Sequence, residues 1–174
     1  MRRAPTSRLA QRQNMPGRCT WGLLLQGKDV PVSFVLDGGA AGVSFDGRKV
    51  TVRTGGARGG RRLLYAWVRR KASLPLKQSL WRQSRALGVT VRSVQVRDQR
   101  SRWGSCSGGR TVSLNFRLFM APGEVMDYVV LHELVHLTVP NHSRAFWSKV
   151  EEHCPRYREH RLWLRKNGHR LKVP

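Results

Sequence analysis

Two histidines and a glutamate stand close together in the segment His132-Glu133-Leu134-Val135-His136, and their types and spacing suit metal-dependent hydrolysis. Residues four apart lie on the same face of a helix, so the imidazoles of His132 and His136 can point at one ion. Glu133 is offset by about 100° around the helix axis, where its carboxylate can reach a water without binding the ion itself. These are the parts of a zinc hydrolase site, so the sequence predicts Zn²⁺ as the cofactor and Glu133 as the catalytic base.

The three polar side chains lie in an otherwise apolar stretch, which is formed by Val129, Val130, Leu131, Leu134, Val135 and Leu137. Burying two histidines and a carboxylate without partners is costly, and a bound metal ion removes that cost. The alternative is a pair of core histidines that are hydrogen-bonded to the backbone.

A third metal ligand must come from outside this segment, because zinc in a hydrolase takes three protein ligands and keeps one position open for water. His142 follows the helix-breaking Pro140, so the chain can turn back and present it. Glu151, Glu152 and His153 on the following helix are competitors, and the spacing alone leaves the choice open.

The elements that must position these residues follow from the apolar pattern. An apolar run over 125–139 predicts a buried helix that ends at Pro140. Alternation of apolar and polar residues over 111–117 predicts a strand with one polar face, and its edge is one along which an extended peptide can pair. The other expected elements are a helix over 63–87 interrupted at Pro75, a strand over 89–96, and helices over 143–154 and 157–166.

The expected fold class is α+β, a compact zincin-like domain with a short β-sheet on the HExxH helix, C-terminal helices and a preceding small β-meander. Residues 1–28 are basic, polar and aperiodic, which predicts a disordered tail. Residues 29–174 are expected to form the catalytic domain. Within it, 29–62 comprise the β-meander and a flexible Gly- and Arg-rich connector over 54–62, and 63–174 form the catalytic core.

Basic residues outnumber acidic residues by 33 to 10, which gives a formal net charge of +23. Such a surface attracts polyanions, so non-specific nucleic-acid binding is one expectation. The alternative is an Arg-rich, solvated surface without such a partner. Trp67 and Trp81 have the chemistry to stack on bases, but packing in or beside the core is the favoured role for both.

Cys19, Cys106 and Cys154 are widely separated, odd in number and form no CxxC pair. This pattern argues against a secreted disulfide framework and for a reducing compartment, so the cytoplasm is the expected location. No apolar run approaches the roughly 18 residues that a membrane span needs, so no membrane partner is expected. No electropositive helix N-terminus is identifiable around Cys106, which disfavours it as a nucleophile.

Several separated motifs run in the same order as those of a known family. They are Arg102-Trp103-Gly104-Ser105-Cys106, Leu114-Asn115, Leu118, Tyr128 to His136, Asn141-His142-Ser143 and Phe146-Trp147. Over about Val89 to Trp163 the chain resembles the YgjP-like metallopeptidases. These are small gluzincin-type proteins, similar to the SprT group of DNA-associated proteases. The N-terminal third matches weakly.

The resemblance implies three zinc ligands, which are His132, His136 and His142. It assigns the role of base to Glu133 and places the loop Arg102–Cys106 at the rim of the cleft. The residues expected to contact the substrate are Arg102, Trp103 and Asn115. An ordinary hairpin connection, with Trp103 as a packing anchor, is the alternative interpretation of that loop.

The favoured function is a zinc metallopeptidase that acts on a protein or peptide substrate, with Glu133 passing a proton from the attacking water to the leaving amine. The oxyanion needs a further donor, for which the sequence offers Tyr128, Arg144, His153 and Tyr157. A zinc-dependent nucleotide pyrophosphatase is the second hypothesis, although the chain lacks a P-loop pattern. The third is a basic nucleic-acid-binding module with structural zinc, which would not need Glu133.

Overall fold

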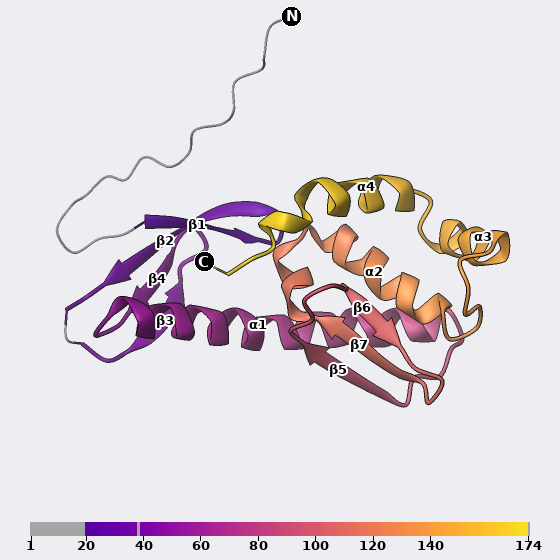
Figure 1. Ribbon diagram of the computed structural model, residues 1–174, viewed down its shortest axis with the longest axis horizontal. Helices are drawn as coiled ribbons and strands as arrows, with labels where there is room; N and C mark the ends of the chain where they lie inside the picture. The colour runs from indigo at the N-terminus through magenta and orange to yellow at the C-terminus, as the bar shows by residue number, and fades with distance from the viewer. Residues whose placement is uncertain (1–19, 38, 174) are drawn as a thin grey trace, which may run out of the picture.

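Over residues 20–37 and 39–173, which the computed structural model describes, the chain folds into two small β-sheets and four α-helices (Figure 1). This arrangement confirms the expected α+β class. Residues 1–19, the greater part of the predicted tail, lie outside the described residues. One long helix, α1 (Ala57–Ala86), extends from the four-stranded sheet at one end of the molecule past the three-stranded sheet at the other.

The N-terminal sheet consists of β1 (Thr20–Leu25), β2 (Lys28–Val35), β3 (Gly42–Phe45) and β4 (Val50–Arg53). The prediction of a tail as far as residue 28 is wrong, because β1 pairs antiparallel with β2 and fully buries Leu23. Gln26 and Gly27 join the two strands, and both have positive φ, as a type I′ hairpin turn requires.

The strand order of this sheet is β1-β2-β4-β3, so the predicted β-meander is also wrong. β4 lies parallel to β2 and antiparallel to β3, and it separates these two strands. The reason lies in burial, because Val50 and Val52 of β4 are both fully buried whereas Ser44 and Phe45 of β3 are exposed. The more apolar strand therefore takes the interior position and the more exposed one forms the edge.

Helix α1 contradicts two predictions, because it begins inside the expected connector over 54–62 and continues through Pro75. Gly60 is buried against β2, and a Cβ atom there would lie 2.7 Å from Cδ1 of Phe34, so the glycine allows close helix–sheet packing. Ala72 and Leu76, on either side of Pro75, are fully buried. This packing holds the helix together where the proline removes one backbone hydrogen bond.

The second sheet consists of β5 (Ser93–Arg97), β6 (Gly104–Cys106) and β7 (Thr111–Asn115), in the order β5-β7-β6. The expected strand over 111–117 ends at Asn115, because the Asn115 side chain accepts a hydrogen bond from the Arg117 backbone and starts the 3₁₀-helix η1 (Phe116–Met120). Ser113 and Asn115 are buried, so the predicted polar face is not exposed. β7 is the central strand, and β5 and β6 form the two edges of the sheet.

Three further helices complete the fold, namely α2 (Gly123–Val135), α3 (Arg144–His153) and α4 (Tyr157–Asn167), and a short 3₁₀-helix η2 (Gly168–Arg170) follows. Helix α2 packs against α1, α3, α4 and β6, so it lies at the centre of the C-terminal layer. It is shorter than the predicted helix over 125–139. Within the described part of the chain, no helix has the length and apolar character needed to cross a membrane.

Candidate metal centre

Three imidazoles converge at the C-terminal end of α2. His132 lies within α2, His136 is its C-cap residue, and His142 lies in the loop that leads to α3. The Nε2 atom of His142 lies 3.0 Å from Nε2 of His132 and 3.1 Å from Nε2 of His136. The pair on the helix therefore receives a third nitrogen from a residue that follows the helix end.

The end of α2 is stabilised by its own side chains, which lets the chain turn back. The Thr138 hydroxyl donates to the carbonyl oxygen of Val135, at 3.0 Å. Nδ1 of His136 lies 3.2 Å from the carbonyl oxygen of Val139. Because a carbonyl oxygen only accepts, Nδ1 must carry the proton, and Nε2 of His136 keeps its lone pair for the cluster.

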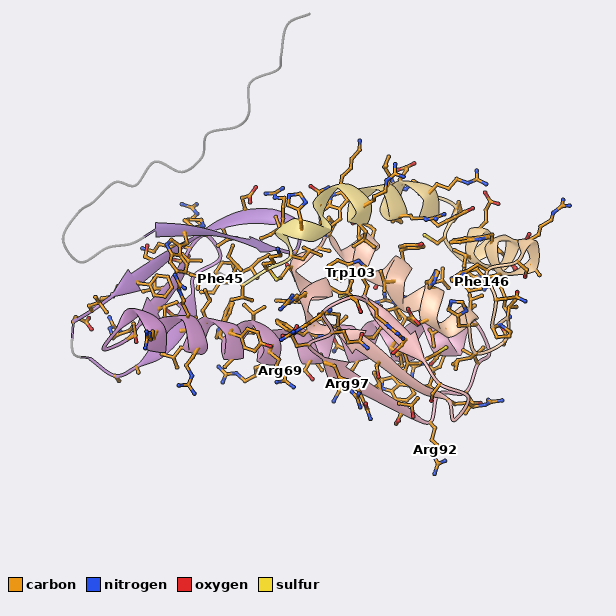
Figure 2. All side chains as sticks on the ribbon, in the orientation of Figure 1. Phe45, Arg69, Arg92, Arg97, Trp103 and Phe146 are labelled. Atoms are coloured by element: carbon orange, nitrogen blue, oxygen red, sulfur yellow. The ribbon has the colours of Figure 1, made fainter. Side chains whose placement is uncertain are left out.

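Two aromatic residues of α3 support the three imidazoles. Phe146, labelled in Figure 2, is fully buried, and its ring centroid lies 4.9 Å from that of His132, 4.5 Å from that of His136 and 4.8 Å from that of His142. Trp147 stacks on His142 with 5.7 Å between ring centroids and 21° between ring planes. Helix α3 therefore restricts the orientation of each ring.

The cluster fits a divalent metal ion. Zinc–nitrogen bonds of about 2.0–2.1 Å in a tetrahedron place the ligand nitrogens about 3.3 Å apart, close to the 3.0 and 3.1 Å found here. Burial, followed by the neighbouring imidazoles, lowers the pKa of His132 to about 4, and burial also lowers the pKa of His136. Both side chains are thus neutral near pH 7, which is the form that binds a metal.

The other three candidates for the third ligand do not join the cluster. Nδ1 of His153 lies 3.2 Å from the carbonyl oxygen of Lys149, and Glu151 pairs with Arg158 at 3.5 Å. Glu152 is exposed and lies beside His153. Among the described residues, the group of three metal-binding side chains contains His142 and none of these competitors.

Glu133 projects into a cavity of about 720 Å³ that the imidazoles share. Glu133 is only 7% exposed. Its side chain packs against β6, where a Cβ atom on Gly104 would lie 2.6 Å from Cγ of Glu133. Burial raises the pKa of Glu133 to about 7, against the opposing effect of the Arg102 guanidinium. A buried carboxylate thus faces the same space as three convergent nitrogens.

The model of the YgjP-like metallopeptidase domain family matches residues 5–167 of the chain. The chain belongs to this family. It is therefore a metallopeptidase, a hydrolase of peptide bonds. A search of curated proteins found no match. Among solved structures, the chain is similar to the metallopeptidase zymogen abylysin of Pyrococcus abyssi, with 26% identity and a TM-score of 0.47, over 52% of this chain and 93% of that one.

The three substrate-contact residues predicted for this YgjP-like chain all line a second cavity, and Arg102 also lines the cavity of the histidines. The whole of β6 lines the cavity of the histidines as well. Trp103, labelled in Figure 2, lines the second cavity, of about 260 Å³, and packs on Gly168, where a Cβ atom would lie 2.9 Å from its Cζ2. The interpretation of Trp103 as a packing anchor agrees with this position.

Asn115 does not line the histidine cavity, and its contact with the substrate stays a prediction. The residue is 2% exposed, and its amide nitrogen donates to the carbonyl oxygens of Gln99, at 2.7 Å, and Arg102, at 3.0 Å. These bonds hold the loop that leads into β6. Asn115 therefore stabilises the loop that contains Arg102, which lines the histidine cavity.

Sequence reasoning missed the residues that the β6–β7 hairpin contributes to the cavity, which are Ser107, Gly108 and Arg110. The run Ser107-Gly108-Gly109-Arg110 was an available turn signal.

None of the four predicted oxyanion donors is among the residues that line the histidine cavity. Tyr128 packs on His132 instead, and burial raises its pKa to about 12. Cys106 lines the cavity, but burial and the charge of Glu133 raise its pKa, which disfavours the thiolate.

Proposed function

We propose that this metallopeptidase holds a zinc ion with His132, His136 and His142 and uses Glu133 as its general base. The observation that carries the proposal is the convergence of three Nε2 atoms beside a buried carboxylate in one cavity. Three protein ligands leave a tetrahedral ion one open position, as a catalytic zinc requires. When bound, zinc supplies a Lewis acid that makes water more acidic and polarises a carbonyl group.

Glu133 is the group placed to move protons. In the proposed reaction its carboxylate accepts a proton from the attacking water and then donates it to the leaving amine. The close approach of Gly104 holds the side chain toward the cavity. A structural zinc site has four protein ligands and needs no such base, so the alternative of a nucleic-acid-binding module with structural zinc is disfavoured.

The substrate is proposed to lie along β6. This strand forms an edge of its sheet and lines the cavity, so an extended peptide can pair with its unpaired backbone groups. The charged residues around the cavity are Arg102, Arg110 and Glu133. With two cations at the rim, peptides that carry acidic residues near the scissile bond are favoured. The same guanidinium groups are the proposed donors to the oxyanion.

Nucleotide pyrophosphate hydrolysis is the second candidate, and the rim arginines are the observation that favours it. Guanidinium groups bind phosphate oxygens through paired hydrogen bonds, and Arg102 and Arg110 both face the cavity. Release of inorganic phosphate or pyrophosphate from nucleoside triphosphates, with no cleavage of any protein, would favour this candidate over the peptidase.

Two further aspects of the proposal concern where the enzyme acts. Cys106 and Cys154 carry free thiols, which supports a reducing compartment such as the cytoplasm. The net charge of +23 supports action near nucleic acid, through salt-sensitive contacts to phosphates.

The test is degradation of an unfolded protein by zinc-loaded enzyme, with Glu133→Gln as the matched variant. The amide keeps the size of the side chain but removes the base, so we expect zinc content to stay equal while cleavage falls by at least about 100-fold. Equal cleavage by both proteins at equal zinc content would show that Glu133 is not the base.

A further inference from the structure

Helix α1 carries a concentration of positive charge that the peptidase site does not use. Its thirty residues include no aspartate or glutamate. Its basic residues are all exposed, and they are Arg58, Arg61, Arg62, Arg69, Arg70, Lys71, Lys77, Arg82 and Arg85. Asp127 of α2 pairs with Arg82 at 2.7 Å and also accepts a hydrogen bond from Ser79, so its carboxylate is already engaged.

The C-terminal half of α1 presents two large apolar side chains among these cations. Leu74 is 63% exposed and Trp81 is 39% exposed. At 100° per residue, these two residues fall on one face of the helix together with three cations, within an arc of about 80° and over a length of about 22 Å. We name this face the cationic stripe, and its residues are Arg70, Leu74, Lys77, Trp81 and Arg85.

The opposite face of α1 explains why the stripe is exposed. Ala72, Leu76 and Leu80 are fully buried and hold the helix on the protein. Trp67, the other tryptophan of α1, is 5% exposed and packs in the core, as expected for both tryptophans. Trp81 is the more exposed of the two, at 39%, so part of its side chain is accessible to a partner.

The position of Trp81 between two cations indicates the chemistry of a partner. Lys77 and Arg85 stand four residues before and after it, which places each about 6 Å away along the helix. Among the described residues, neither forms an ion pair with a carboxylate. An aromatic face flanked by free cations matches a base that stacks while its phosphates are neutralised.

Other occupants match the stripe less well. A membrane-bound helix needs a continuous apolar face, whereas only Leu74 and Trp81 are apolar here and Lys77 lies between them. A protein interface needs an apolar core of several residues. Residues 1–19 include five arginines and no acidic residue, so their charge repels the stripe. In duplex DNA the base faces are stacked on one another, and Trp81 could not reach them.

We infer that the cationic stripe of α1 binds single-stranded nucleic acid, with a base stacked on Trp81 and phosphates bound by Lys77 and Arg85. Arg70 extends the track of charge toward the centre of the helix. This surface is separate from the cavity of the histidines, because no stripe residue lines that cavity in the described part of the chain. The inference therefore holds whether or not the proposed zinc chemistry does.

The experiment measures binding of a fluorescently labelled 20-mer of oligothymidylate to the full-length Glu133→Gln protein by anisotropy. Adding Trp81→Leu keeps an apolar side chain but removes the aromatic face. We expect binding to weaken about 5- to 150-fold, which corresponds to loss of one stacked base at about 1–3 kcal/mol. Circular dichroism checks that the variant is folded, and Trp81→Phe, which restores an aromatic face, should recover most of the affinity.

A second arm tests the cations against the general charge of the protein. Lys77→Gln with Arg85→Gln should make the slope of log K against log salt concentration shallower by about 1.4, since each phosphate contact to a single strand contributes about 0.7. The matched control is Arg165→Gln with Lys166→Gln on α4, which removes two exposed charges elsewhere. The inference would be overturned if both double variants changed the salt slope equally, or if Trp81→Leu had no effect on binding. Tighter binding to duplex DNA or to phosphatidylserine vesicles than to the single strand would also overturn it.

Discussion

Replacement of Gly104 by alanine tests whether β6 positions Glu133, the proposed base. A Cβ atom at this position would lie 2.6 Å from Cγ, 2.7 Å from Oε1 and 2.8 Å from Cδ of Glu133. Non-bonded carbon atoms normally approach to about 3.5–4.0 Å, so the new methyl group overlaps the side chain by about 1 Å. Gly104 has no positive φ, so alanine adds bulk without backbone strain.

The size of the effect follows from the distance that Glu133 must move. Displacing a catalytic group by about 1 Å costs roughly 100-fold in rate, or about 2.7 kcal/mol in the activation barrier. We therefore expect kcat of Gly104→Ala to fall about 100-fold while KM changes by less than about threefold. Overpacking should also lower the free energy of unfolding by roughly 1–3 kcal/mol, which lowers Tm by roughly 2–4 °C per kcal/mol.

The assay compares kcat, KM and bound zinc for the wild type, Gly104→Ala and Gly108→Ala. Gly108 lines the same cavity, but nothing lies within 4 Å of the position of its added Cβ. Gly108→Ala should therefore keep wild-type rates. If folded Gly104→Ala retained kcat within threefold, the contact between β6 and Glu133 would have no role in placing the base.

Three other substitutions test separate parts of the site. His142→Ala should lose zinc during dialysis against a chelator that leaves the wild type loaded, whereas Glu151→Gln should keep its zinc. Zinc content is measured by atomic absorption, and equal retention by the two variants would exclude His142 as a ligand. Asn115→Ala should lower the free energy of unfolding in urea by about 1–3 kcal/mol, because the carbonyl oxygens of Gln99 and Arg102, in a part-buried site, lose their donor. A change below 0.5 kcal/mol, on the order of an ordinary surface substitution, would contradict that role. Arg110→Glu should reduce the preference in kcat/KM for glutamate-flanked over lysine-flanked peptides at least about tenfold, or 1.4 kcal/mol; an unchanged ratio would remove Arg110 from substrate selection.

The parts of the site that were predictable from sequence are those set by local geometry. Two histidines four residues apart on a helix share a face whatever surrounds them, so His132 and His136 could be paired without the fold. The break at Pro140 also allowed a third ligand to return. Helices α3 and α4 begin within a residue of the expected positions because Pro140 and Pro155 separate them.

The incorrect predictions concern features that depend on contacts between distant segments. Pro75 and the glycines near residue 60 argue locally against a helix, yet α1 continues because its two halves pack on different layers. The alternation over 111–117 predicted a half-exposed strand, but Ser113 and Asn115 are buried, and Asn115 is hydrogen-bonded to the loop before β6. Arg110 reaches the cavity only because the β6–β7 hairpin folds over α2, which periodicity does not encode.

The HExxH spacing is therefore necessary for this site, but it does not by itself position the side chains. The segment supplies two nitrogens and a carboxylate, and two contacts from other elements decide how they are used. Phe146 touches all three imidazole rings from α3, and Gly104 admits the Glu133 side chain against β6. A protein with the same five residues on α2 but with a larger side chain than glycine at position 104 of β6 could still bind a metal ion. It would lose the placement of the proposed base, so if the proposal is correct, zinc binding and catalysis should separate in the Gly104 variant.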